Sequence, residues 1–166
     1  MQWAEAWAYP QKQPEWWIAV VNRLAGFYCD NRQFGQAKQK LSENISLAGQ
    51  ALPANHPELA KLYNNMAGAA HGLGVYSQSL EYHKKALAIR EEIYEANHPD
   101  VAISYNNIAG AYYAMGDYQQ AKIYIDKAMQ VQEEILPEGH PHRKASEEGQ
   151  RLIYHALNKR EAGSRE

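Results

Sequence analysis

A segment of 42 residues recurs along this chain of 166 residues, and no other feature restricts its possible folds as strongly. The triplet Asn-His-Pro stands at 55–57 and again at 97–99, and Gly-His-Pro follows at 139–141. The same shift aligns Tyr-Asn-Asn-Met-Ala-Gly at 63–68 with Tyr-Asn-Asn-Ile-Ala-Gly at 105–110, and a weaker copy, Asn-Arg-Leu-Ala-Gly, lies at 22–26. Three copies at a fixed period predict a solenoid, in which each repeat packs on its neighbours.

Each copy has the apolar spacing of two helices. Tyr105, Ile108 and Tyr112 follow one another at intervals of three and four residues, and a Gly-Asp pair at 116–117 interrupts the pattern before it resumes at Ala121. Each copy is therefore expected to be a helical hairpin. The predicted helices span 14–31, 34–51, 57–73, 77–95, 99–115, 119–136 and 141–160.

A histidine and a proline mark the start of each copy. Proline suits the first turn of a helix, where its missing amide costs nothing, and it pushes the preceding residue into an extended, capping conformation. His56, His98 and His140 are separated by whole hairpins, so they are too far apart to share a zinc ion. We expect them to cap the helices that follow.

The register divides the chain into six parts. Gln2 aligns with Asn44, so the N-terminal segment, residues 1–13, is expected to hold the end of a preceding second helix. We assign 14–54 to a divergent first repeat, 55–96 to a second repeat and 97–138 to a third. Residues 139–160 are expected to form a capping helix and 161–166 a tail; the apolar stripe of the capping helix is Gly149, Leu152, Ile153 and Ala156.

Composition and charge exclude several function classes. The net charge of −2 gives no basic surface for a polyanion, which argues against nucleic acid as a partner. The single cysteine, Cys29, excludes an internal disulfide and a cysteine zinc site, and it suits a reducing compartment. The chain has no apolar run long enough to cross a membrane. We expect a cytoplasmic protein without membrane contact, metal or cofactor.

The residues of the hairpins resemble the tetratricopeptide repeat. They combine a small residue in the first helix (Ala67, Ala109) with Gly74 or Gly116, Tyr76 or Tyr118, and Ser79 or Ala121. The 42-residue period, with the stretch NHPDVAISYNNIAGAYYAMGDYQQAKIYIDKAMQVQEEI, is similar to the kinesin-light-chain type, which is also widespread in bacterial multi-repeat proteins, where we expect this chain to belong. The resemblance is strong over 55–140 and weaker over 14–54.

The resemblance implies an all-α fold: a right-handed α-solenoid of about three helix hairpins and a C-terminal capping helix. It also implies a protein-interaction scaffold, in which the first helices line a concave groove that takes an extended peptide or a partner helix. In such repeats an asparagine of the groove often holds the ligand backbone, which here would be Asn65 and Asn107, with Arg23 in the same column of the first copy.

The residues themselves support a polar face on each first helix. If Tyr105, Ile108 and Tyr112 face the partner helix, then 106, 107, 110 and 113 point elsewhere. An amide there donates to and accepts from a peptide backbone. The expected groove residues are Arg23, Lys61, Asn64, Asn65, Asn106, Asn107 and Tyr113.

A purely structural role is the alternative for the same columns. The asparagines can instead join adjacent first helices and set the twist, and we favour that role for Asn64 and Asn106 but ligand contact for Asn65 and Asn107. The repeated glycines, Gly26, Gly68 and Gly110, either leave room in the groove or permit close packing. For Gly68 and Gly110 we favour packing.

No catalytic constellation is recognisable, so we do not expect an enzyme. Glu91-Glu92 and Glu133-Glu134, which stand beside Arg90 and Gln132, recur at the repeat period and are interpreted as a solvated face, and Cys29 as a small buried residue. Lys61 and Arg23 are the only cations in the groove columns, which argues against the subtype that grips a terminal carboxylate.

Self-association is the alternative function. Four tryptophans lie in the first 17 residues and none afterwards, which predicts an aromatic N-terminal face that binds a second copy or another part of a longer chain, from which this sequence is expected to be a fragment. The residues of that face are Trp3, Trp7, Trp16 and Trp17.

Overall fold

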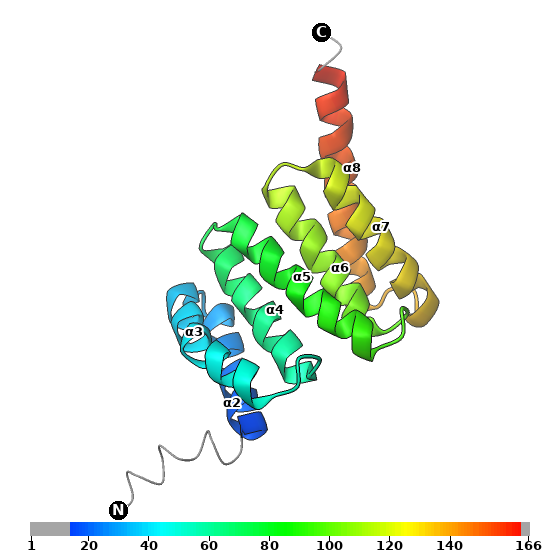
Figure 1. The fold of residues 1–166 in the computed structure, drawn as a ribbon. Helices are drawn as coiled ribbons and strands as arrows, with labels where there is room; N and C mark the ends of the chain where they lie inside the picture. The colour runs from blue at the N-terminus through cyan, green and yellow to red at the C-terminus, as the bar shows by residue number, and fades with distance from the viewer. Residues whose placement is uncertain (1–13, 164–166) are drawn as a thin grey trace, which may run out of the picture. The chain divides into compact units, whose positions relative to one another are not determined.

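Seven α-helices make up the part of the chain that the computed structural model describes, residues 14–163, and that part contains no strand. The prediction of an all-α fold is confirmed, and each predicted helix end lies within three residues of the observed one. The helices are α2 (Pro14–Asp30), α3 (Phe34–Ala51), α4 (Pro57–Gly72), α5 (Tyr76–Ile93), α6 (Pro99–Ala114), α7 (Tyr118–Ile135) and α8 (Pro141–Gly163) (Figure 1).

The chain divides into two compact units between Ile93 and Tyr94. In the first unit α2 pairs with α3 and α4 with α5, and α3 also packs against α4. In the second unit α6 pairs with α7, and α8 packs along α7. Each unit has its own apolar core.

Histidine caps begin the helices that follow the repeat boundaries, as predicted. The Nδ1 atom of His56 accepts a hydrogen bond from the backbone N–H of Glu58 at 3.1 Å. His98 makes the same contact with Asp100 at 3.1 Å, and His140 with His142 at 3.2 Å. Each ring thus satisfies one of the backbone donors that a helix start leaves without a partner.

The core of the first unit lies where α2, α3 and α4 meet. Ile18 and Val21 of α2 pack in one cluster with Leu41 and Ala48 of α3 and Leu62 of α4. This burial explains why apolar residues recur three and four positions apart in each of these helices, since only one face of each helix is covered.

The core of the second unit corrects the predicted stripe of the capping helix. Ile153 is buried as expected, but Leu152 is 52% exposed, and Leu157, which the prediction omitted, is buried. The orientation of α8 is fixed by Asp126 of α7, whose carboxylate accepts hydrogen bonds from Gln150 and from the hydroxyl of Tyr154. Because 150, 153, 154 and 157 share one face of a helix, Leu152 lies at the edge of that face and stays exposed.

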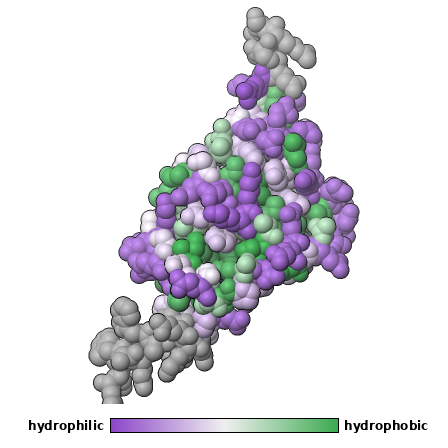
Figure 2. Space-filling view, in the orientation of Figure 1, coloured by the Kyte–Doolittle hydropathy of each residue, from purple (hydrophilic) through white to green (hydrophobic). Residues whose placement is uncertain are grey.

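Hydrophobic side chains reach the surface between hydrophilic ones in the space-filling view (Figure 2). The large exposed ones include Trp16 and Phe27 of α2 and Leu152 of α8. None of the described helices is long and apolar enough to cross a membrane.

The turns inside the hairpins require a left-handed residue. Gly74 and Gly116 occupy this position with φ of 76° and 79°. In the first hairpin the same column holds Arg32, at φ 58°, where a side chain is sterically unfavourable. The divergent first repeat thus carries local strain that the others avoid.

Replacing Arg32 with glycine should raise the free energy of unfolding by about 1 kcal/mol, because glycine adopts this conformation without strain. Urea denaturation followed by circular dichroism measures the change. Arg32→Ala, which keeps the Cβ atom, should have little effect, and Gly74→Ala should destabilise. Equal stability of Arg32→Gly and Arg32→Ala would show that the turn stores no strain.

A histidine occupies an apolar core column of the first unit. His83 of α5 aligns with Leu41 and Ile125, is only 6% exposed, and its Nδ1 atom has no hydrogen-bond partner. Burial, with smaller contributions from the nearby His71 and Arg90, lowers the pKa of His83 to about 4. The ring is therefore neutral in the folded protein near neutral pH.

Stability should fall as the pH decreases from about 6.5 to about 4, because the unfolded chain takes up a proton on His83 before the folded chain does. The full contribution is present above pH 6.5, and its loss is about 3 kcal/mol at and below pH 4. His83→Leu, which restores the apolar residue of the column, should flatten this part of the profile in urea titrations at several pH values. The exposed control His155→Leu should leave the slope unchanged, and a slope that survives in His83→Leu would contradict the assignment.

Candidate functional site

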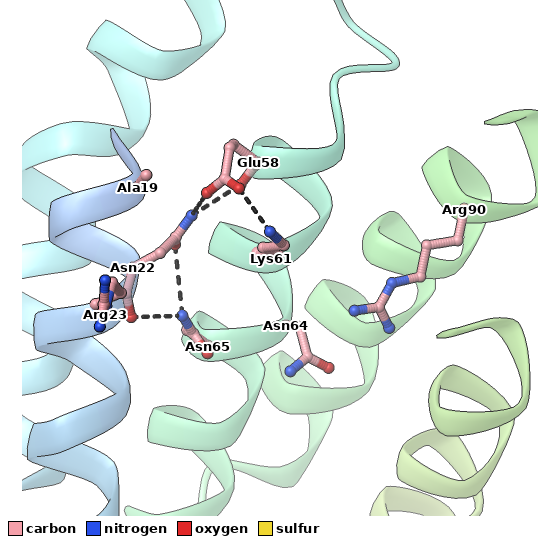
Figure 3. A pocket seen from close by; sticks show the side chains of 8 residues that line it. All are labelled: Ala19, Asn22, Arg23, Glu58, Lys61, Asn64, Asn65 and Arg90. Atoms are coloured by element: carbon pink, nitrogen blue, oxygen red, sulfur yellow. Dashed lines mark hydrogen bonds and ion pairs between the residues drawn. The ribbon is translucent and has the colours of Figure 1, made fainter. Parts of the chain in front are cut away.

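A polar pocket of about 270 Å³ opens on the first helices of the first unit (Figure 3). The helix α4 supplies half of its lining and α2 most of the remainder, with a single residue from α5. The lining residues are Ala19, Asn22, Arg23, Glu58, Lys61, Asn64, Asn65 and Arg90. Four of the seven expected groove residues, Arg23, Lys61, Asn64 and Asn65, thus lie together here.

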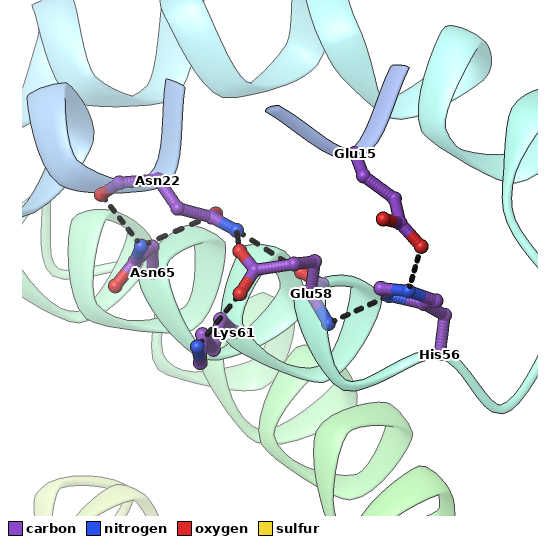
Figure 4. Close-up of polar contacts among 6 residues, drawn as sticks. All are labelled: Glu15, Asn22, His56, Glu58, Lys61 and Asn65. Carbon is purple, nitrogen blue, oxygen red and sulfur yellow. Dashed lines mark hydrogen bonds and ion pairs between the residues drawn. The ribbon is translucent and has the colours of Figure 1, made fainter. Parts of the chain in front are cut away.

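Asn22 joins the two first helices at the base of this pocket (Figure 4). Its amide nitrogen donates to the backbone oxygen of Glu58 at 3.1 Å and to the carboxylate of Glu58 at 2.9 Å. In return, Asn22 accepts hydrogen bonds from the amide nitrogen of Asn65, through its backbone oxygen at 3.1 Å and its side-chain oxygen at 3.4 Å. Asn22 therefore joins adjacent first helices, which is the structural role favoured above for Asn64 and Asn106 of the same column.

Asn65, which we expected to contact a ligand, uses its amide nitrogen to hold α2. Both hydrogen bonds that it makes to Asn22 are donated by that nitrogen. Its side-chain oxygen remains at the half-buried edge of the pocket as an acceptor. A ligand would therefore meet Asn65 through the oxygen, while the nitrogen fixes the orientation of the amide.

Glu58 is held as a carboxylate. Burial by itself would raise the pKa of Glu58, but hydrogen bonds from Lys61 and Asn22 outweigh it and keep the pKa below its usual range. The ammonium of Lys61 lies 2.7 Å from the carboxylate. Because Nδ1 of His56 acts as an acceptor, its Nε2–H donates to the carboxylate of Glu15 at 2.9 Å, and this hydrogen bond fastens the start of α2 to the start of α4.

The pocket carries more cations than anions. Arg23, Lys61 and Arg90 line it together with Glu58 as the sole carboxylate. Arg23 is exposed and makes no hydrogen bond or ion pair within residues 14–163. The pocket therefore favours a ligand group with negative charge.

Sequence reasoning missed Arg90, which was not among the expected groove residues. Glu91 and Glu92 are indeed exposed, but Arg90 is buried, and its guanidinium extends from α5 toward Asn64 (Figure 3). Its position in the repeat marks the buried column, because the residues that align with Arg90 at the 42-residue period, Ala48 and Gln132, are buried as well. Charged side chains are rarely buried unless they are paired, so a buried arginine beside the pocket is distinctive.

The repeated glycines face open space. A Cβ atom added at Gly26, Gly68 or Gly110 would meet no atom within 4 Å. The prediction that Gly68 and Gly110 serve close packing is therefore wrong, and their absent side chains instead leave room beside the polar face.

The second unit places two expected groove residues around an apolar hollow of about 170 Å³. Asn106 and Tyr113 of α6 lie at its edge, and Asn107 is not among the lining residues. Asn106 accepts a hydrogen bond from the hydroxyl of the buried Ser146 in α8 at 3.2 Å, which gives it an inter-helix role. The remaining lining residues are small or apolar: Ala109, Gly110, Ile125, Ala145, Gly149, Leu152 and Ile153.

The tryptophans of the expected assembly face do not share one environment. Trp3 and Trp7 lie outside the described residues. Trp17 packs against the core of the first unit and donates from Nε1 to the side-chain oxygen of Asn44 at 2.7 Å. Trp16 is exposed. Trp17 thus serves the hairpin itself.

The described residues provide no activated nucleophile at Cys29. The side chain is half-buried, and burial together with the nearby Asp30 raises the pKa of its thiol. A raised pKa lowers the thiolate fraction, which is the reactive form. Within residues 14–163, no group of three or more His, Cys, Asp or Glu side chains is placed to hold a metal ion.

Asn22→Ala should lower the free energy of unfolding by about 2 kcal/mol, because it removes the hydrogen bonds that hold Glu58 and the side-chain acceptor of Asn65, whose bond to the backbone oxygen of residue 22 remains. It should also raise the pKa of Glu58, which loses one of its donors. Urea denaturation measures the first effect and carboxyl NMR titration the second. Asn31→Ala, at an exposed asparagine that bonds its own helix, is the matched control and should change stability by less than about 0.5 kcal/mol. An equal loss of stability in both variants would show that the hydrogen bonds of Asn22 between α2 and α4 do not stabilise the fold.

Comparison with known proteins identifies the repeats. Residues 58–134 match the sequence profile of the tetratricopeptide repeat. No curated protein sequence matches the chain.

Solved structures superpose on most of the chain. A Podosopora anserina protein described as a kinesin light chain with nearly identical TPR-like repeats gives a TM-score of 0.71 at 25% identity, over 89% of this chain and 70% of that chain. BtubC (BKLC) from P. vanneervenii gives a TM-score of 0.77 at 19% identity, over 85% of this chain and 56% of that chain. The TPR domain of Arabidopsis FLU gives a TM-score of 0.60 at 19% identity, over 70% of this chain and 95% of that chain. The last two indicate the fold alone. With its helical hairpins and the match over residues 58–134, the chain is similar to tetratricopeptide repeat proteins, and its structural neighbours include kinesin-light-chain-like members.

Proposed function

We propose that this chain is a scaffold that binds an extended peptide segment of a partner protein through the polar pocket on α2 and α4. Tetratricopeptide repeats in general mediate protein–protein interaction. The observation that carries the finer proposal is the lining of the pocket, in which amides and three cations surround one carboxylate that is already paired.

The amides suit a peptide backbone. Asn65 offers a side-chain oxygen whose orientation is fixed by the bonds of its nitrogen to Asn22, and an oxygen held in this way accepts a backbone N–H at little entropic cost. Asn64 lines the same pocket one residue earlier on α4. Contacts of this kind read the backbone, so they tolerate many side chains in the ligand.

The cations suit an acidic side chain of the same segment. Arg23 has a planar group that pairs with a carboxylate through two parallel hydrogen bonds, and it has no competing partner within the described residues. Lys61 is already paired with Glu58, so Arg23 is the cation that is available to attract such a group. We therefore propose a peptide with at least one Asp or Glu.

The glycines and the apolar hollow support the same function. Gly26 and Gly68 leave open space where a side chain would otherwise stand, so a ligand backbone can approach the helices. In the second unit, the hollow beside Gly110 has the size and apolar walls for a single apolar side chain. We also propose a cytoplasmic location, on the ground of the single cysteine.

A selection of peptides displayed on phage against the full chain tests this function. Selected peptides should contain an acidic residue, and fluorescence anisotropy should show that Arg23→Ala weakens binding about tenfold, the loss of one charge-assisted hydrogen-bonded pair. Arg23→Lys should recover part of the affinity. Added salt should weaken binding to the wild type more than to Arg23→Ala.

Gln36→Ala, at an exposed position of the second helix α3, is the control and should bind as the wild type does. Circular dichroism should show equal folding of all variants, since Arg23 makes no hydrogen bond or ion pair within the described residues. Peptides whose affinity is indifferent to Arg23 would contradict the proposed pocket.

A further inference from the structure

A second polar pocket, of about 260 Å³, lies in the second unit between α6, α7 and the connection that precedes α6. The residues that α7 contributes recur at intervals of three and four, so they share one face of that helix. The pocket has no residue in common with the polar pocket on α2 and α4 or with the apolar hollow. The lining residues are Ala96, Asn97, Tyr105, Lys127, Gln130, Val131 and Glu134.

The first unit closes the equivalent position with a hydrogen bond. There the amide nitrogen of Asn55 donates to the carboxylate of Glu92 at 3.1 Å. At the 42-residue period these two residues align with Asn97 and Glu134, whose side chains make no hydrogen bond or ion pair within residues 14–163. The second unit therefore keeps an amide and a carboxylate available where the first unit has joined them.

Two further columns make the second unit the open copy. Ile89 of α5 is buried, whereas the smaller Val131 of α7 is half-buried and borders the pocket. Gln130 stands where α5 has Ala88, and its amide makes no hydrogen bond within the described part of the chain. The pocket thus has more room than the equivalent position of the first unit, and one more polar group.

The cation of this pocket is held away from its carboxylate. The ammonium of Lys127 lies over the rings of Tyr105 and Tyr124, 5.5 Å from each centroid. Seven residues separate Lys127 from Glu134, which places them about 10 Å apart along the axis of α7. At that distance salt screens most of the repulsion between Lys127 and a cation bound at Glu134. Glu134 therefore determines the charge preference at its end of the pocket.

We propose that this pocket binds an arginine side chain presented by a partner protein. A guanidinium has five N–H donors in a planar fork, so it pairs with the carboxylate of Glu134 and still donates to the amide oxygens of Asn97 and Gln130. The aliphatic stem of the arginine packs on Val131. A lysine has three donors and no planar fork, which makes it the weaker ligand.

The shape of the pocket favours a side chain of a protein over a free small molecule. Small-molecule sites are mostly apolar and bury most of the ligand surface. Here Asn97, Gln130 and Glu134 are all exposed, so a single arginine binds weakly and the surrounding surface of a partner supplies the remaining affinity. Because the pocket is separate from the one on α2 and α4, this proposal does not depend on the function proposed above.

NMR titration of the full, isotope-labelled chain with N-acetyl-arginine N-methylamide tests the proposal. The backbone amides of residues 97 and 130–134 should shift and reach saturation. N-acetyl-citrulline N-methylamide, which has nearly the same shape without the charge, should bind at least about fivefold more weakly, because hydrogen bonds between charged groups are the stronger ones. The lysine derivative should bind with intermediate affinity.

Glu134→Gln should weaken binding of the arginine derivative at least about fivefold, because it removes the charge and keeps the shape. Val131→Ile, which restores the residue of the closed copy, should also weaken binding. Glu92→Gln is the matched control, and Arg23→Ala separates this pocket from the one on α2 and α4; both should leave the affinity within about twofold of the wild type. Shifts that do not saturate, equal affinities of the arginine and citrulline derivatives, or an unchanged affinity of Glu134→Gln would each overturn the proposal.

Discussion

The polar face of the first unit depends on one buried amide. Asn22 is the point at which α2 and α4 are joined by side-chain hydrogen bonds, and it bonds both the backbone and the carboxylate of Glu58. A buried amide must satisfy its donors and acceptors, so it accepts only one relative position of the two helices. The same contacts fix the orientation of Asn65 and keep Glu58 charged beside Lys61. The pocket is thus a consequence of how the two helices are joined.

The 42-residue period was sufficient to predict the helices, because caps and turns depend on residues close in sequence. The histidine caps and the proline starts follow from local stereochemistry, and the structure confirms them. The column analysis also brought Arg23, Lys61, Asn64 and Asn65 together correctly, since a constant period places equivalent residues on one face. What a single repeat specifies locally was therefore predictable.

The errors concern contacts between helices, which local patterns do not specify. Arg90 was not among the expected groove residues, but the packing of α5 turns its column inward and brings it to the pocket. Leu152 was assigned to the core of α8, whereas Asp126 of α7 fixes α8 through Gln150 and Tyr154 and leaves Leu152 exposed. Gly68 and Gly110 were assigned to packing, but in the folded protein they border open space.

The two units use the same columns for different chemistry. At the column of Asn22 and Asn106 both units retain an amide that bonds a neighbouring helix, through Glu58 in one and Ser146 in the other. Beside it, the first unit places cations and a carboxylate, while the second places Gly110 and the small residues of α8 around a hollow. The amide column maintains the geometry, so the adjacent columns are free to vary without loss of the fold.

The first repeat departs from the others where it has no preceding hairpin within the described residues. The apolar stripe of its α2, Val20, Leu24 and Phe27, keeps the large side chains of a covered face although nothing within residues 14–163 covers it. If the stripe were an adapted solvent-facing end, its columns should hold polar residues, as the outer faces of terminal capping repeats do. The retained Val20, Leu24 and Phe27 instead have the apolar character of their buried counterparts in α4, Leu62, Met66 and Ala69.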